Sequence, residues 1–223
     1  SNTDGIVKNT GLDKYSASFY NSNDFFGGAV KVESRIIYAS LKDQATLLSN
    51  NAGFIGNVIG TALYWNPTLP IYNTNGSYNV VGDDYLNPVQ LLNSYTDFTN
   101  TNKLLGSINT TWKINSKLKY QFLFGVESST SSRKSQLLPT MEISGAAFQA
   151  TVPGSSEVKF GTAFINNQNK FNKTFEHTLN YNNDFGDNFN LDALVGYSYY
   201  DYTADGNFAS GKGYDVNQTN LID

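Results

Sequence analysis

The sequence predicts an all-β protein that forms a segment of an antiparallel transmembrane β-barrel. Several segments alternate between apolar and polar residues, which is the pattern of strands with one apolar face. Their connections are short and long in turn, and outer-membrane barrels have short periplasmic turns and longer extracellular loops. Aromatic residues make up 14% of the 223 residues and gather on the apolar faces, whereas charged residues make up only 15%.

Six segments carry the alternation, and we expect each to be a strand. They are residues 12–21, 29–41, 103–114, 118–128, 171–185 and 189–202. In the clearest segment, Tyr120 and Phe122 alternate with Lys119 and Gln121. Most of these segments are longer than the strands of ordinary sheets, which have about 5–6 residues.

The connections between these segments fall into two classes. Three are short, at residues 21–28, 115–117 and 186–188. Two are long, at about 42–102 and 133–170, and the stretch 204–223 reads as the start of a third. Loops beyond about 12–15 residues are uncommon in compact domains. We therefore interpret residues 1–223 as one partial barrel domain with its long loops at one end.

The first long loop contains local structure. Apolar residues recur at helical spacing between Phe54 and Leu63, with Asn50 or Asn51 as a cap and Pro67 just past the end. Asn87 and Pro88 predict the start of a second short helix. A tight turn is expected at Asn75-Gly76. The loop is thus predicted to be a fixed surface feature.

Five stretches in this order resemble the barrel region of SusC/RagA-type TonB-linked outer-membrane transporters. They are DGIVKNTGLDKYSASFYN, ALYWNPTLPIYNTNGSYNV, LNPVQLL, KLLGSINTTWKINSKLKYQFLFGVE and FEHTLNYNNDFGDNFNLDALVGYSYYD. The resemblance implies a bacterial outer-membrane barrel of 22 strands with an N-terminal plug. It also implies import of oligosaccharides or peptides, with a SusD-like surface lipoprotein and TonB as partners. Six strands cannot enclose a plugged lumen, which takes about 22. The chain is therefore expected to be an arc of the barrel, without the plug and the TonB box.

Other function classes find little support in the composition. The net charge is −4, with no basic stripe for a nucleic acid, and there is no cysteine. His177 is the only histidine and lies on a mostly apolar strand face, where an interfacial role is expected. We therefore expect no enzyme activity, no catalytic residue, no metal site and no cofactor.

Two groups of residues are candidates for binding. Aromatic and acidic side chains of the first long loop are candidates for contact with substrate, and the alternative is that they pack the loop against its own helices or against a lid protein. They are Tyr64, Trp65, Tyr72, Tyr78, Asp83, Asp84 and Tyr85. Polar residues opposite the apolar faces are expected to face the lumen. They are Lys31, Glu33, Arg35, Lys119, Gln121, Glu127, Asn180 and Asn182.

Two alternatives remain at this stage. A soluble or surface-exposed β-sandwich, such as an adhesin module, would pack the apolar faces of two sheets together. A simple diffusion porin would share the barrel and the lipid bilayer as its surroundings.

Overall fold

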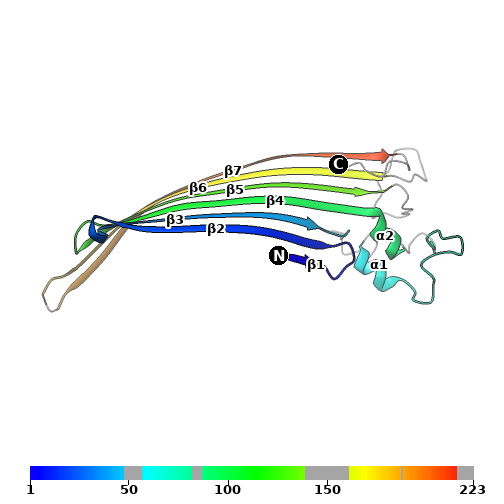
Figure 1. Cartoon of the computed structure of the whole chain (residues 1–223), viewed down its shortest axis with the longest axis horizontal. Coiled ribbons are helices and arrows are strands. Elements are labelled where there is room, and N and C mark those ends of the chain that lie inside the picture. Colours follow the sequence, from blue (N-terminus) through cyan, green and yellow to red (C-terminus); the bar gives the residue numbers. More distant parts are fainter. Residues whose placement is uncertain (48–56, 82–86, 139–160, 187, 215–223) are drawn as a thin grey trace.

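The strands lie side by side, in sequence order, in one long arched sheet (Figure 1). The computed structural model describes residues 1–47, 57–81, 87–138, 161–186 and 188–214. Within these residues the antiparallel sheet has seven strands. They are β1 (Asn2–Asp4), β2 (Gly11–Phe25), β3 (Val30–Gln44), β4 (Tyr95–Lys113), β5 (Leu118–Leu137), β6 (Gly161–Asp184) and β7 (Asn190–Tyr214).

The register joins the apolar faces of the strands into one band. Ile108 is paired with Phe124, Phe124 with Phe175, and Phe175 with Tyr199. Paired residues project from the same face of a sheet, so this row crosses four strands as one apolar stripe. The ring centroids of Phe124 and Phe175 are 4.9 Å apart. In β4, β5, β6 and β7 the apolar stretch covers roughly the 9–11 residues that a tilted strand needs to span a bilayer.

No second layer covers this band within the described residues, which form a single sheet. Phe19 keeps 59% and Val195 72% of its surface exposed. The buried apolar residues of the described chain are Val58, Leu91 and Leu137, which pack together at the loop end. A sandwich of two sheets is therefore not what the described residues form, and the band is free to contact lipid.

His177 lies within the apolar band. Its Nδ1 is 2.6 Å from the hydroxyl of Tyr120, and its ring centroid is 5.0 Å from that of Phe122. The polar atoms of two neighbouring side chains thus pair with each other on a face that is otherwise apolar, which lowers the cost of placing them in an apolar environment.

The strands extend further than the sequence predicts. Residues 2–4 add a short strand, and β2 continues through the expected turn at 21–28, leaving only a tight turn after Phe25. The expected long loops at 42–102 and 133–170 shrink, because β3 ends at Gln44, β4 begins at Tyr95, β5 reaches Leu137 and β6 begins at Gly161. Residues 204–214, expected to begin a loop, belong to β7.

The reason for this difference is the composition of the added segments. They are rich in Asn, Ser, Thr and Gly on both faces, so they lack the alternation that marks a half-apolar strand. The backbone ladder nevertheless continues through them, because pairing with the neighbouring strand satisfies their N–H and C=O groups.

The short turns lie at one end of the sheet, and two helices lie at the other (Figure 1). Helix α1 (Val58–Tyr64) begins after Asn57, later than the predicted start, and Asn50 and Asn51 lie outside the described residues. Helix α2 (Pro88–Ser94) begins as predicted, with Asn87 as its cap and Pro88 at the first position. None of the described helices has the length and hydrophobicity needed to cross a membrane.

Candidate functional site

Residues 57–81 and 87–97 form a folded unit at the loop end of the sheet, which we call the loop platform. It consists of α1, a hairpin around residues 71–79, α2 and the start of β4. The hairpin is closed by a Tyr72–Tyr78 bridge, and Gly76 adopts the positive φ of 82° that the tight turn requires. The turn predicted at Asn75-Gly76 is therefore confirmed.

Asn87 connects the parts of the loop platform. Its Oδ1 accepts hydrogen bonds from the backbone N–H groups of Val89 (3.0 Å) and Gln90 (3.1 Å), which caps α2. Its Nδ2 donates to the carbonyls of Ile71 (2.7 Å) and Asn79 (3.1 Å), which ties the hairpin to the helix. Because Asn87 is only 1% exposed, water cannot replace these four bonds.

We expect Asn87→Asp to destabilise the loop platform by about 1–3 kcal/mol, the cost of leaving buried polar groups unsatisfied. The carboxylate still caps α2 but places an acceptor oxygen against two carbonyls. The matched control is Asn57→Asp, because Asn57 caps α1 through Ile59 and Gly60 and donates no side-chain bond within the described chain. Limited proteolysis of the loop platform measures the effect. Equal sensitivity of the two variants would contradict the role of the donated bonds.

The predicted loop aromatics take different positions. The Tyr72 and Tyr78 rings lie 5.3 Å apart, and the Tyr78 hydroxyl accepts a bond from Asn93 Nδ2 at 2.9 Å. Tyr64 and Tyr72 are exposed at 57% and 49%, so they can contact a ligand, whereas Trp65 is half-buried and donates its Nε1 to the Leu69 carbonyl. Asp83, Asp84 and Tyr85 lie outside the described residues.

An ion pair between a buried carboxylate and a half-exposed guanidinium joins the loop platform to the barrel wall. Asp97 in β4 is 1% exposed and accepts a fork of hydrogen bonds from Arg133 in β5, with Nε 2.9 Å from Oδ1. The Tyr95 hydroxyl donates to Asp97 Oδ2 at 2.9 Å. The hydrogen bond to Asp97 raises the pKa of the Arg133 guanidinium. Burial and the nearby Asp97 charge raise the pKa of Tyr95 to about 12.

Tyr95 should make the loop platform sensitive to high pH. Its folded pKa lies above the ordinary value of 10.0, so its contribution to stability is complete below pH 10. This contribution is then lost as the pH rises from about 10 to about 12, because only the unfolded state releases the proton readily. We expect the midpoint of alkaline unfolding of the loop platform to move upward in Tyr95→Phe, which has no hydroxyl proton to release. An unchanged midpoint would show that other groups control it.

The structure places all eight predicted lumen residues on one face of the sheet, opposite the apolar band. Glu33 accepts bonds from Lys31 Nζ (2.8 Å) and the Tyr20 hydroxyl (2.7 Å), and Arg35 lies 5.7 Å from the Tyr20 ring. Asn180 and Asn182 both donate to Asp192. A hollow of about 350 Å³ on this face is lined by Arg35, Glu127 and Tyr200, among others.

Several neighbours of the predicted residues cannot be identified from the sequence alone. Tyr20, Asp192 and Tyr200 lie on the polar face, and only the register shows that they adjoin predicted residues. Asp97 and Arg133 are 36 positions apart and carry no local signal. Within the described residues no three acidic, histidine or cysteine side chains gather as metal ligands.

The sequence comparison finds two similar TonB-dependent receptors. No family model matches the sequence. The chain is 28% identical over 235 residues to "TonB-dependent receptor P3" of Formosa agariphila, covering 96% of the chain and 20% of that protein. It is 30% identical to "TonB-dependent receptor P26" of the same organism, covering 89% of the chain and 18% of that protein. The chain thus spans about a fifth of the length of these relatives.

Solved structures share the fold. The RagAB peptide importer in the "closed-closed" state matches 99% of the chain and 24% of that protein's chain, with a TM-score of 0.69 and 16% identity. The same importer in the "open-open" state matches 96% of the chain with a TM-score of 0.69 and 16% identity. The predicted fold class, an antiparallel segment of a transmembrane barrel, is therefore confirmed.

Proposed function

We propose that this chain, a barrel segment of a SusC/RagA-type TonB-dependent protein of the bacterial outer membrane, is part of a nutrient importer. The imported nutrients are oligosaccharides or peptides. The importer acts with a SusD-like surface lipoprotein and draws its energy from TonB, through a part of the protein outside this chain.

The observation that carries this proposal is the two-sided wall formed by the sheet. One face presents a continuous apolar band, and the other presents Lys31, Glu33, Arg35 and further polar side chains. A wall that is apolar outside and polar inside is what a barrel with a polar lumen requires. The match to two TonB-dependent receptors over most of the chain favours active import over the simple diffusion porin.

The loop platform is the surface that we propose for the lipoprotein or the cargo. Its parts are held by caps and hydrogen bonds, so it presents a defined surface at the end of the sheet away from the short turns. Exposed Tyr64 and Tyr72 suit the apolar face of a sugar ring or an apolar peptide side chain. The importer among the solved neighbours is a peptide importer, which adds support for peptides as cargo.

An uptake experiment tests the proposal. Cells carrying the intact transporter are grown on defined peptides or defined oligosaccharides, with and without a functional TonB. We expect uptake of one cargo class to require both the transporter and TonB, and Tyr64→Ala with Tyr72→Ala to reduce it. Uptake that continues without TonB would favour the porin, and normal uptake by the double variant would remove these tyrosines from the cargo path.

A further inference from the structure

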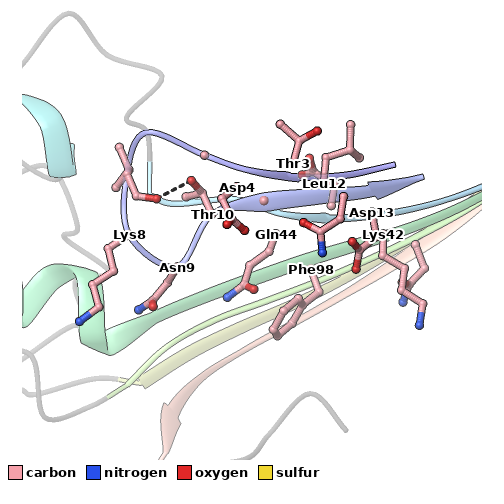
Figure 2. Close-up of a pocket in the computed structure, with 16 residues that line it drawn as sticks. Thr3, Asp4, Lys8, Asn9, Thr10, Leu12, Asp13, Lys42, Gln44 and Phe98 are labelled. Atoms are coloured by element: carbon pink, nitrogen blue, oxygen red, sulfur yellow. Dashed lines mark hydrogen bonds between the residues drawn. The ribbon is translucent and has the colours of Figure 1, made fainter. Parts of the chain in front are cut away.

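A hollow of about 560 Å³ opens at the loop end of the sheet, where β1 and the turn at residues 5–10 meet β2, β3 and β4 (Figure 2). Two neighbouring rows of the register line it. The first row is Asn2, Asp13, Lys42 and Asn100, and the second is Asp4, Gly11, Gln44 and Phe98. Each row crosses four strands, so the sheet forms the floor of the hollow, and the turn at residues 5–10 borders it.

The hollow lies on the outer side of the barrel wall. Asp13 is two positions from Tyr15, and Lys42 is four positions from Tyr38, so both share the face of the apolar band. Figure 2 shows Lys42, Gln44 and Phe98 projecting on one side of the strands and Thr3 and Leu12 on the other. The main lining side chains therefore face the surroundings of the barrel and not its lumen.

The depth of the hollow corresponds to the polar layer of the outer leaflet. The apolar band ends near the paired Tyr38 and Leu104. The paired Lys42 and Asn100 lie four residues beyond, which is about 13 Å along a strand and about 10 Å along the membrane normal for a tilt of about 40°. The headgroup regions add roughly 5–8 Å on each side of the hydrocarbon core. The first row therefore lies at the outer edge of the headgroup layer, and the second row lies above it, where the sugars of an outer-leaflet glycolipid extend.

The lining has unused hydrogen-bonding capacity. Within the described part of the chain, the side chains of Asp4, Asp13, Lys42, Gln44 and Asn100 make no hydrogen bond or ion pair. Phe98 keeps 42% of its surface exposed beside them. Gly11 allows β1 to lie close to β2 in the second row, because a Cβ there would approach the Thr3 carbonyl oxygen to 3.2 Å.

These groups match a sugar headgroup. Carboxylates and amides bind hydroxyls through directional hydrogen bonds, and an aromatic ring contacts the apolar face of a pyranose. The Lys42 ammonium can bind a phosphate or carboxylate attached to the sugar. We propose that this hollow binds the saccharide headgroup of an outer-leaflet glycolipid, lipopolysaccharide, against the outside of the barrel. The proposal rests on the membrane position of the band and is independent of the imported cargo.

Binding of purified lipopolysaccharide to the intact transporter, followed by native mass spectrometry, tests the proposal. We expect the double variant Asp13→Ala, Lys42→Ala to bind about tenfold more weakly, because charge-assisted hydrogen bonds are lost. The matched control is Lys14→Ala, which removes a lysine next to Asp13 on the opposite face. Heat-modifiable electrophoretic mobility confirms that each barrel is closed. Full binding by the double variant, or equal loss in the control, would overturn the proposal.

A second measurement uses the absence of cysteine from this chain. In Asn100→Cys, with any cysteine elsewhere in the transporter replaced, lipopolysaccharide should slow maleimide labelling severalfold. Thr99→Cys, one residue away on the other face, should be labelled at the same rate with and without it. A last labelling experiment uses the sugar chain of lipopolysaccharide without its lipid. If it protects Asn100→Cys as well as the complete glycolipid does, the assignment to a membrane lipid is wrong and the hollow takes free saccharide.

Discussion

Phe122→Arg is expected to destabilise the barrel by about 2–4 kcal/mol, the cost of an arginine on the lipid face near the bilayer midplane. Phe122 lies at the centre of the apolar stretch of β5, paired with Thr110 and His177. No described residue packs over this face, so the guanidinium would have to enter hydrocarbon. Reversible denaturation of the intact transporter in lipid vesicles measures the change.

Gln121→Arg is the matched control for this prediction. Gln121 is the adjacent residue on the polar face, where it reaches Thr111 Oγ1. Gln121→Arg adds an arginine to the same strand as Phe122→Arg does, but on the face that we assign to the lumen. We expect little change in the free energy of unfolding. A large loss in the control together with a small loss in Phe122→Arg would reverse the assignment of the two faces.

Arg133→Ala is expected to destabilise the junction between the loop platform and the wall by about 1–3 kcal/mol, because water reaches the half-exposed guanidinium but not the carboxylate. The substitution leaves the buried Asp97 carboxylate without its cation, and a buried charge that loses its partner is costly. The loss should fall on the segment around Tyr95, which donates to the same carboxylate. Hydrogen exchange at the start of β4 and the end of β5 measures it.

Two further variants separate charge burial from general damage at this junction. Asp97→Asn with Arg133→Met removes both charges, and we expect it to recover part of the loss. Lys31→Ala breaks an ion pair that remains accessible to water, and it should change stability little. If Asp97→Asn with Arg133→Met is less stable than Arg133→Ala, the pair stabilises the junction by more than neutralising the buried Asp97 charge.

The sequence predicts the wall well where one face is apolar. Leu118–Val126 shows this, because hydrophobic contact with lipid selects every second residue and leaves the period in the sequence. The same logic fails for 129–137 and 204–214, where both faces are polar and only backbone pairing defines the strand. Strand ends in such segments cannot be found from side-chain pattern.

Some features of the loop platform can likewise be predicted from the sequence, and others cannot. Capping is local, so Asn87 and Pro88 predict the start of α2 directly. The bonds from Asn87 to Ile71 and Asn79 depend on how the hairpin docks, and the Asp97–Arg133 pair depends on the register of β4 and β5. Because these contacts join distant positions, no short stretch of sequence encodes them. Contact of the loop aromatics with cargo stays a prediction.

The small apolar cluster of Val58, Leu91 and Leu137 lies at the loop end, apart from the uncovered band of the sheet. The hydrophobic effect in water therefore stabilises the cluster at the loop end, whereas contact with the bilayer stabilises the sheet. Urea should unfold the loop platform at a lower concentration than the barrel wall, so heating or denaturant would produce two separate unfolding transitions. A change of lipid thickness should shift only the later event.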